Sequence, residues 1–383
     1  MENKPIKLMI VTPYFYPKIG GLENYAFNIA KGLKKNYNYE IIVVTSNHED
    51  KIYKEETIEG MKIYRLPYQF KVSNTPISFN WKKQIKDIIE KEKPDVINAH
   101  SPVPFISDVT ARIANKLKIP FYLTYHAGSM KKGIFYLDWI ISIYENIFLK
   151  KTLNLSTKVF PVSEYVKVQF PKEFQSKCIV IPNFINKNNI TDTTPKKKKN
   201  QLIFISSLDK SHIWKGLDDV IKSINIYKNQ FNNKIRLIII GDGDYKTSYE
   251  TLVRELKLEQ EVIFAGAKFG KEKDKIIQES EALIFYTKTT SDAFPTVFLE
   301  AWANKTPIIS ANIGPAPYLI EEGKTGVLVE ANNPEKLAFG LNNLLKNSEL
   351  RKNLIQNGSI VVNNFTLDKQ IEKMNKIIVG GLR

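Results

Sequence analysis

Cysteine is almost absent from this sequence, and so are the long apolar runs of membrane proteins. Cys178 is the single cysteine among 383 residues, which excludes an internal disulfide framework and indicates a reducing compartment. No stretch approaches the ~18 uninterrupted apolar residues of a membrane-spanning helix. The chain starts with MENKPIKLMIVTP, which lacks the long apolar segment and the cleavage site of a signal peptide. We therefore expect a cytoplasmic protein in which Cys178 is a small buried hydrophobe.

Acidic residues are outnumbered by basic ones. The sequence has 56 Lys and Arg against 40 Asp and Glu, a formal net charge of +16. Such a charge favours nucleic acid, an anionic membrane face or a small phosphorylated ligand as partner. The lysines are scattered, and no RNA-recognition, zinc-module or basic-zipper sequence accompanies them, so we expect no nucleic acid partner. No group of His, Cys and carboxylate residues has the spacing of metal ligands, so no metal is expected.

The length of the chain exceeds what one hydrophobic core usually organises, which predicts two domains. Short β-branched runs alternate with helical periods throughout: KLMIVT, EIIVVTS, DVINAH and PFYLTY, then QLIFIS, IRLIII, EVIFAG, ALIFYT, TPIIS and GVLVE. This alternation is typical of an α/β fold with parallel sheets and crossover helices. We expect two doubly wound domains that face each other across a cleft, with ligands at the carboxyl ends of the strands.

The boundary between the two predicted domains is placed at the segment NKNNITDTTPKKKKN, residues 186–200. This segment is polar and has no periodicity, as expected of an exposed linker. The N-terminal domain is therefore predicted over residues 1–185 and the C-terminal domain over 201–365. Residues 366–383 are predicted to form a C-terminal helix, with a return to the N-terminal domain as one option. The lysines at 196–199 are expected to be solvated, with a membrane or nucleotide contact as the alternative.

The first strand leads into two glycines and a helix. From Leu22 onward, apolar residues recur with a period of 3.6, which predicts an amphipathic helix. Gly20 and Gly21 immediately precede it. Glycines allow close approach of a ligand to the backbone, and a helix N-terminus attracts phosphate, so a donor-binding role is one interpretation. A tight turn is the other.

Several segments resemble, in order, the N-terminal motifs of the family-four retaining glycosyltransferases: YPKIGGLENYAFNIAKGL, INAHSPVPFIS, LTYHAG, PVSE and VIPNFI. In the second half, HIWKGLDDVI, IIIGDGD and DAFPTVFLEAWANKTPII are similar to the donor-binding half of that family. The last segment is the most specific, because the family is marked by two acidic residues separated by seven, here Asp292 and Glu300. The resemblance covers nearly the whole chain. It implies the GT-B fold, with two Rossmann-like domains, acceptor binding in the first and donor binding in the second.

Transfer from a nucleotide diphosphate sugar requires cations and backbone donors around the leaving diphosphate. The resemblance places Lys215 on that diphosphate, and lysine is a compact charge suited to phosphate. The family usually has an arginine upstream, where this sequence has Ser207. Either Lys210 or His212 supplies the missing charge, or the donor is held by fewer contacts. Gly243 is interpreted first as a turn glycine and second as a neighbour of the nucleotide.

Asp292 and Glu300 are carboxylates that accept hydrogen bonds from sugar and ribose hydroxyls. By resemblance, Asp292 holds the transferred sugar and Glu300 the ribose. Asp292 stands where the family has glutamate, one methylene longer, which predicts an altered fit to the donor sugar. Capping of the following helix is the alternative role of Asp292. The start of that helix is expected to add phosphate contacts through Phe294, Pro295, Thr296 and Val297.

His126 follows a predicted strand, and the resemblance places it near the donor sugar and phosphate. Histidine there donates a hydrogen bond or moves a proton near neutral pH. We therefore name His126, Lys215 and Asp292 as catalytic candidates. His100 also ends a predicted strand, and its structural and functional interpretations remain equal. The family does not generally require a divalent ion, so transfer without metal or cofactor is predicted.

The segment KKGIFYLDWIISIYENIFLKK, residues 131–151, is predicted to be a helix with one polar stripe, formed by Asp138, Ser142, Glu145 and Asn146. Lysine pairs at both ends suit a helix that lies in a membrane interface and touches anionic lipid. A helix packed inside the N-terminal domain is the alternative. The membrane interpretation predicts a lipid-linked acceptor and a protein that is peripheral at the inner face of the membrane.

These patterns predict a retaining glycosyltransferase that transfers a sugar from a nucleotide diphosphate sugar to a glycan or lipid-linked acceptor, in surface polysaccharide or glycolipid synthesis. Ser207 and Asp292 leave a second interpretation, a paralogue that binds nucleotide sugars without turnover. A third is a basic scaffold at a membrane surface or on nucleic acid, which ignores nucleotide sugars and binds polyanions with a steep salt dependence.

Overall fold

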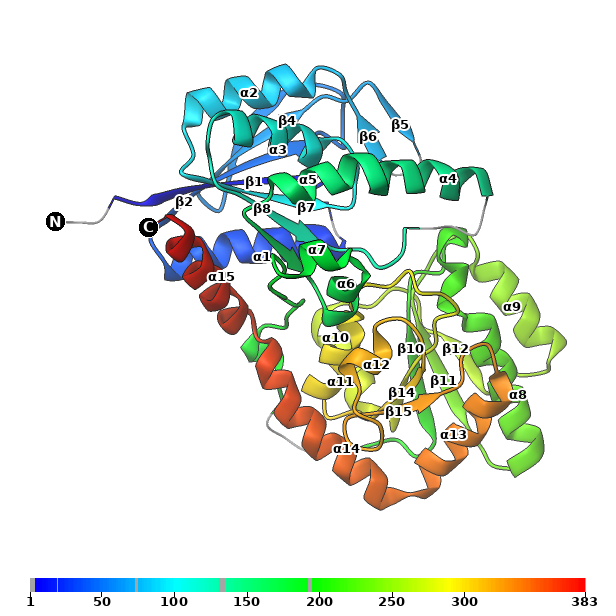
Figure 1. Cartoon of the computed structure of the whole chain (residues 1–383). Coiled ribbons are helices and arrows are strands. Elements are labelled where there is room, and N and C mark those ends of the chain that lie inside the picture. The colour runs from blue at the N-terminus through cyan, green and yellow to red at the C-terminus, as the bar shows by residue number, and fades with distance from the viewer. Residues whose placement is uncertain (1–3, 19, 73–74, 131–134, 192–194, 383) are drawn as a thin grey trace. The chain divides into compact units, whose positions relative to one another are not determined.

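The computed structural model describes residues 4–382 except 19, 73–74, 131–134 and 192–194. Two compact units make up the chain (Figure 1). The first unit comprises the described residues of Met1–Phe184 and Leu367–Arg383. The second unit comprises those of Ile185–Thr366. Each unit is built around its own mainly parallel sheet.

The first unit contains a sheet with the strand order β3-β4-β2-β1-β7-β8-β9. Its strands are β1 (Ile6–Thr12), β2 (Tyr39–Ser46), β3 (Lys54–Ile58), β4 (Met61–Leu66), β7 (Val96–Ser101), β8 (Phe121–Tyr125) and β9 (Lys158–Pro161). Neighbouring strands are parallel except for β3, which pairs with β4 in the antiparallel sense. A separate hairpin joins β5 (Phe70–Val72) to β6 (Thr75–Ile77). The four predicted strands of this half are confirmed.

Helices cover both faces of the first sheet (Figure 1). They are α1 (Gly21–Asn36), α2 (Trp81–Glu92), α3 (Ile106–Lys116), α4 (Phe135–Ile143), the π-helix η1 (Tyr144–Leu149), α5 (Lys150–Leu155), α6 (Glu164–Gln169), α7 (Lys172–Gln175) and α15 (Leu367–Leu382). The predicted apolar face of α1 is confirmed, because Tyr25, Ala26, Ile29, Ala30 and Leu33 are buried. The C-terminal helix α15 packs against α1. A Cβ atom on Gly32 of α1 would lie 3.0 Å from the Ile371 side chain of α15, so the small residue permits this close contact.

The second unit contains a sheet with the order β12-β11-β10-β13-β14-β15, in which every neighbouring pair is parallel. Its strands are β10 (Gln201–Ile205), β11 (Arg236–Ile240), β12 (Val262–Phe264), β13 (Ala282–Phe285), β14 (Ile308–Ala311) and β15 (Val327–Val329). All six predicted strands of this half are confirmed. These runs are apolar on both faces because helices cover both sides of a parallel sheet.

The helices of the second unit follow its strands in the expected alternation. The helices are η2 (Lys187–Asn189), η3 (Lys210–Lys215), α8 (Leu217–Phe231), α9 (Lys246–Glu255), α10 (Gly270–Glu279), α11 (Thr296–Ala303), α12 (Ala316–Leu319), α13 (Pro334–Lys346), α14 (Ser348–Val361) and η4 (Val362–Phe365). Buried aliphatic residues of α8 and α13 complete the core over one face of the sheet.

The lysine-rich segment before β10 differs from the expectation of a solvated linker. Lys197 Nζ donates a hydrogen bond to Thr306 Oγ1 at 2.8 Å, and Lys198 Nζ lies 2.6 Å from Glu279 Oε2. Burial lowers the pKa of Lys197 to about 7. The charge run therefore includes two lysines that help to fix the segment on the second unit, of which Lys197 is the more buried. Composition alone did not reveal this contact.

Among the described residues, no helix is both long enough and apolar enough to cross a bilayer.

Candidate active site

The carboxyl ends of β10, β11 and β13 lie at one edge of the second sheet, where parallel strands usually bind ligands. The loops after β10 and β11 are joined by backbone hydrogen bonds, Leu208 N to Asp242 O and Tyr245 N to Leu208 O, both 2.9 Å. Gly243 has φ +157°, and a Cβ atom there would lie 2.3 Å from Asp209 N. Only glycine fits this conformation and this close approach. Gly243 is therefore a turn glycine at the carboxyl edge of the second sheet.

Lys215 is held by an acidic and aromatic environment at this edge. It ends η3, and Gly216 follows with a left-handed conformation that starts α8. The Lys215 ammonium forms an ion pair with the Asp292 carboxylate, and both side chains are mostly buried. The ammonium also lies 4.4 Å from the centre of the Trp214 ring. The fold thus brings together two residues that are 77 positions apart, and both were named from the sequence.

Asp292 does not cap the helix that follows. The N-cap of α11 is Pro295, and no side chain caps it. Phe294 and Pro295 are both buried, and the Phe294 ring packs 5.7 Å from that of Phe365. These two residues therefore reach a donor only through their backbone. Thr296 is exposed and Val297 is half-buried at the start of α11.

Glu300 lies one turn further along α11 and forms a second ion pair. Lys273 Nζ lies 2.8 Å from Glu300 Oε1, whereas Glu300 Oε2 is buried and has no hydrogen-bond partner among the described residues. A buried carboxylate oxygen without a partner is costly unless a ligand donates to it. The sequence did not single out Lys273, because it lies on an otherwise ordinary charged helix.

The loop around Ser207 is exposed and acidic. Ser207 Oγ donates to Asp209 Oδ2 at 2.6 Å, and the Lys210 backbone N–H donates to Asp244 Oδ1 at 2.6 Å. His212 Nδ1 lies 4.0 Å from the same Asp209 carboxylate. The Lys210 side chain is exposed. The His212 ring lies 6.2 Å from the Trp214 ring that Lys215 also contacts. The replacement of the expected arginine by Lys210 or His212 stays a prediction.

In the first unit, His126 and His100 form a pair. His126 follows β8, and His100 is the last residue but one of the neighbouring strand β7. His100 Nδ1 lies 2.9 Å from His126 Nε2. Burial lowers the pKa of His100 to about 3. Burial, and then the neighbouring His100, hold the pKa of His126 well below its ordinary value. Both imidazoles are therefore neutral near pH 7, so His126 acts as a hydrogen-bonding group there and not as a cation.

Gly20 and Gly21 lie at the N-terminus of α1 as predicted, but a carboxylate of the chain faces them. Gly20 is the N-cap with an extended backbone. A Cβ atom on Gly20 would lie 2.1 Å from Glu23 Oε2, whereas no described atom outside its own neighbourhood lies within 4 Å of a Cβ atom on Gly21. A carboxylate at a helix N-terminus occupies the position that attracts a phosphate. The position of Glu23 therefore favours the interpretation of Gly20 and Gly21 as a tight turn. Glu23 was not among the site residues predicted from the sequence.

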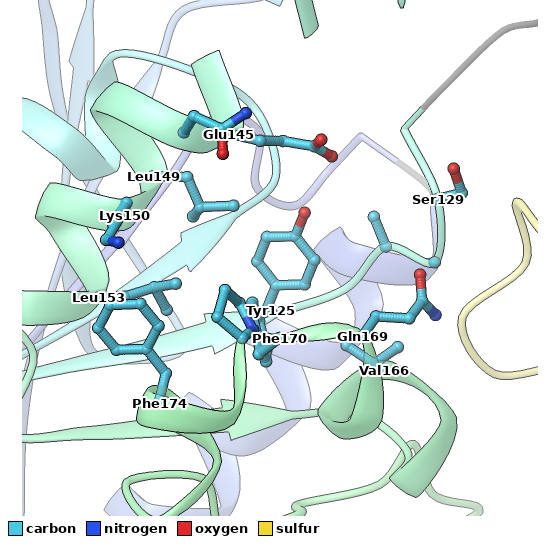
Figure 2. Close-up of a pocket in the computed structure, with 14 residues that line it drawn as sticks. Tyr125, Ser129, Glu145, Leu149, Lys150, Leu153, Val166, Gln169, Phe170 and Phe174 are labelled. Atoms are coloured by element: carbon cyan, nitrogen blue, oxygen red, sulfur yellow. The ribbon is translucent and has the colours of Figure 1, made fainter. Parts of the chain in front are cut away.

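A cavity of about 390 Å³ lies at the carboxyl end of β8, next in the chain to His126. Figure 2 shows Tyr125 at its centre, with Glu145 and Lys150 on one side and Gln169 on the other. Aromatic carbon from Phe170 and Phe174 completes the wall. Such a mixture of rings and a few polar groups is typical of a small-molecule site. The sequence did not predict this cavity, because its residues come from five separate helices and strands and from the loops between them.

Among the described residues, no three His, Cys, Asp or Glu side chains lie together in a way that would hold a metal ion. Metal independence stays a prediction, which activity with and without chelator would test.

Two family models cover most of the chain. Residues 19–189 match glycosyltransferase family 4, and residues 186–360 match glycosyl transferases group 1. The chain belongs to the family-four glycosyltransferases. It is 29% identical over 378 residues to an uncharacterised glycosyltransferase of Methanocaldococcus jannaschii, an alignment that covers 97% of this chain and 98% of the relative.

Two further comparisons extend this assignment. This family-four protein is 20% identical over 369 residues to the phosphatidyl-myo-inositol mannosyltransferase of Mycobacterium leprae, covering 94% of this chain and 93% of the relative. Its fold is similar to that of Anabaena HepE solved in complex with UDP, with a TM-score of 0.75, 16% identity and coverage of 98% and 100%. The fold is therefore GT-B, with two Rossmann-like domains.

Proposed function

We propose that this family-four glycosyltransferase transfers a sugar from a nucleoside diphosphate sugar to a glycan or lipid-linked acceptor, with retention of the anomeric configuration. The observation that carries the proposal is the Lys215–Asp292 ion pair at the carboxyl ends of the second sheet. A half-buried cation beside a carboxylate suits a ligand that joins a diphosphate to a polyhydroxyl sugar.

The two partners of this pair have separate roles in the proposal. A diphosphate brings more negative charge to Lys215 than Asp292 does, so donor binding draws the ammonium toward the phosphates. The Asp292 carboxylate then accepts hydrogen bonds from the sugar hydroxyls. In the transition state, negative charge grows on the leaving diphosphate, and a cation already in place stabilises that charge. Glu300 Oε2, which lacks a partner in the described structure, is assigned to the ribose hydroxyls.

His126 is assigned a hydrogen bond to the reacting sugar or its phosphate. Because both members of the His100–His126 pair are neutral, one ring donates to the other, and Nδ1 is the nitrogen of His126 that is left for a ligand. His100 is a positioning residue in this assignment, since it is completely buried.

The donor site is tested by titration calorimetry with uridine, guanosine and adenosine diphosphates. We expect one of them to bind, and Lys215→Ala to weaken its binding at least tenfold, the effect of losing about 1.4 kcal/mol of charge-assisted contact. Lys222→Ala is the matched control, because Lys222 is an exposed lysine on α8 that also pairs with carboxylates. Equal losses in both variants would contradict the assignment of Lys215.

Turnover separates the enzyme from a paralogue that only binds nucleotide sugars. Glu300→Ala and Lys215→Ala are each expected to reduce transfer about a hundredfold or more, the scale of losing one stabilising group in the transition state. Binding of a donor sugar to the wild type without release of the nucleoside diphosphate would favour the binding-only alternative. Retention is checked by the anomeric configuration of the first product formed, measured by NMR.

We also propose that the protein contacts anionic membranes through α4. Large apolar side chains on this helix are exposed: Phe135 by 88%, Tyr136 by 63% and Trp139 by 63%. This exposure contradicts the alternative of a packed helix for α4, whereas η1 in the same segment is packed in the first unit, with Leu149 buried. Lys131 and Lys132, which the sequence placed at the start of the segment, lie outside the described residues. Aromatic side chains at a surface with nearby cations are typical of helices that lie in a membrane interface.

Vesicle co-sedimentation tests the membrane contact. The double variant Trp139→Ser, Phe135→Ser is expected to lose most binding to vesicles that contain phosphatidylglycerol, because it removes the exposed aromatic surface. Ile360→Ser serves as control, since Ile360 is 62% exposed on α14 of the second unit. Unchanged sedimentation of the double variant would refute the role of α4.

A further inference from the structure

An apolar cavity lies in the first unit beneath the exposed helix α4. Its volume is about 320 Å³. Its wall comes from three separate segments: Ile77 of β6, Pro104 and Phe105 of the loop before α3, and Ile140, Ile143 and Phe148 of the helix formed by α4 and η1. This cavity is distinct from the one around Tyr125, which has polar groups in its wall.

The main polar group in the wall of the apolar cavity is already hydrogen-bonded. Asp108 Oδ1 accepts from Thr152 Oγ1 at 2.5 Å, and Asp108 Oδ2 accepts from the Phe105 backbone N–H at 2.9 Å and from Tyr144 Oη at 3.2 Å. The carboxylate therefore serves the structure of the wall and has little left to offer a ligand. A cavity with satisfied polar groups favours hydrocarbon over water or sugar.

The cavity opens onto the same exposed apolar surface that we assign to the membrane. Ile140 is 55% exposed, Phe105 40% and Phe148 38%, although all three contribute to its wall. Apolar side chains therefore continue from the inside of the cavity to its mouth. An acyl or isoprenoid chain can enter from a bilayer along such a surface without crossing a polar rim.

Positive charge lies at the edge of this mouth. The Arg112 guanidinium, on the exposed face of α3, lies 5.9 Å from the centre of the Phe148 ring. The structure records no ion pair of Arg112 with a carboxylate in the part of the chain that it describes. The first unit also carries most of the charge, with 31 of the 56 basic and 19 of the 40 acidic residues, or +12 of the net +16. The surroundings thus favour a lipid with an anionic head group.

The helix itself separates two kinds of chemistry. Ile140, Ile143, Tyr144 and Phe148 face the apolar cavity, whereas Glu145, Asn146, Leu149 and Lys150 line the cavity around Tyr125. The π-helical segment η1 spans the change, and such segments often occur at functional sites. One helix therefore presents a hydrocarbon wall on one side and a polar wall on the other, as an amphiphilic ligand requires.

We propose that the cavity beneath α4 binds the hydrocarbon chain of a membrane lipid with an anionic head group. Resting on the proposed function, we assign this lipid as the carrier of the acceptor. Because a cavity of roughly 150 Å³ lined by aliphatic side chains holds one benzene molecule, a cavity of about 320 Å³ accommodates part of one chain and leaves the remainder in the bilayer.

The test uses the full-length protein, without vesicles, and the fluorescent polyene parinaric acid as probe. We expect saturable binding of one probe per chain, and displacement by dodecyl phosphate but not by inorganic phosphate. Displacement by inorganic phosphate would show that the head group alone is recognised and would overturn the proposal. Absence of saturable binding would overturn it as well.

Two variants locate the probe. Ile143→Trp fills the cavity from α4, and Ile140→Trp blocks its mouth at a half-exposed position where folding is not at risk. Both are expected to weaken probe binding at least tenfold. Ile360→Trp is the matched control, because it adds the same ring at an exposed isoleucine of the second unit. Wild-type affinity in Ile140→Trp would place the probe elsewhere and refute the assignment.

Two further measurements keep this proposal separate from its alternatives. If the mouth of the cavity is instead an interface between two copies of the chain, Ile140→Trp will convert a dimer to a monomer in sedimentation velocity, and this result would overturn the lipid assignment. Donor hydrolysis by the wild type reports on the proposed function alone. A protein that binds the probe but hydrolyses no nucleotide sugar would support the lipid-binding cavity and contradict the proposed transferase activity. A protein that hydrolyses a nucleotide sugar but does not bind the probe would support the transferase activity and contradict the lipid-binding cavity.

Discussion

At the scale of single residues, burial determines the chemistry of His100 and His126. An imidazole that is surrounded by protein loses the hydration that stabilises its charged form, so its pKa falls. Here the second ring lowers the pKa further, because two adjacent imidazolium ions repel each other. His126 therefore provides a neutral donor or acceptor at physiological pH, and negative charge on a donor must be met by other groups, of which Lys215 is the best placed in the second unit.

The same burial predicts how stability depends on pH. Unfolded histidine binds a proton below about pH 6.5, whereas folded His100 does so only near its pKa of about 3. The contribution of His100 is therefore complete above about pH 6.5 and is lost as the pH falls toward 3. In this pH window, each such histidine lowers the free energy of unfolding by about 1.4 kcal/mol for every unit by which the pH falls. Urea unfolding should show a shallower pH dependence for His100→Phe than for the wild type.

His212→Gln is the control for this experiment, because His212 is partly exposed in η3 of the second unit. Its stability should follow the wild-type pH dependence. If His100→Phe and the wild type lose stability in parallel between about pH 6 and pH 4, His100 is not held neutral in the folded protein.

Residue identities in the donor half could be predicted from the sequence, but several of their partners could not. Lys215, Asp292 and Glu300 stand in segments with a specific spacing. Lys273 and Glu23 have no such signal, because a charged residue on a helix is usually solvated. The His100–His126 contact depends on β7 and β8 being neighbours in the sheet, and strand order is a property of the whole chain that a local pattern does not contain.

At the scale of elements, the loops after β10 and β11 pack against each other because glycine permits their close contact. Gly243 has a positive φ, and its position leaves no room for a Cβ atom next to the Asp209 backbone. Gly243→Ala is therefore expected to destabilise the protein by about 2 kcal/mol or more, from backbone strain and steric conflict together. Nucleoside diphosphate binding should weaken in parallel, because the strained loop adjoins the donor site that we propose.

Gly266→Ala separates the two causes. Gly266 also has a positive φ, +72°, but no neighbouring heavy atom lies within 4 Å of a Cβ atom built there. Its substitution is expected to cost only about 1 kcal/mol, the strain of a left-handed alanine. Equal free energies of unfolding for the two variants would show that close packing at Gly243 contributes nothing.

The central strands were predictable because each is a continuous apolar run flanked by turn residues. Five strands of the first unit, β3, β4, β5, β6 and β9, carry weaker signals and were not predicted. β3 is a largely exposed edge strand with the sequence KEETI, and β5 and β6 have three residues each. Short strands and an exposed edge strand offer few apolar positions, so propensity alone does not distinguish them from loops. The apolar run of β4 (MKIYRL) is interrupted by Lys62 and Arg65. The exposure of α4 was one of two interpretations of the sequence, since an apolar helix is usually packed inside a domain.

At the scale of the whole molecule, charge and chemistry are divided between the two units. The first unit carries +12 of the net charge of +16, together with the exposed aromatic helix and both cavities described above. The second unit carries the Lys215–Asp292 and Lys273–Glu300 pairs. This division agrees with acceptor and lipid chemistry in the first unit and donor chemistry in the second, which is the arrangement we propose.

The proposed transfer reaction is tested most directly by a screen of the purified wild type against uridine, guanosine and adenosine diphosphate sugars, with release of nucleoside diphosphate as the measured quantity. We predict slow release from one donor without an acceptor, faster release when an extract of anionic lipids is added, and loss of both in Lys215→Ala. No release from any donor, with or without lipid, would contradict the account of this protein as a glycosyltransferase of lipid-linked acceptors.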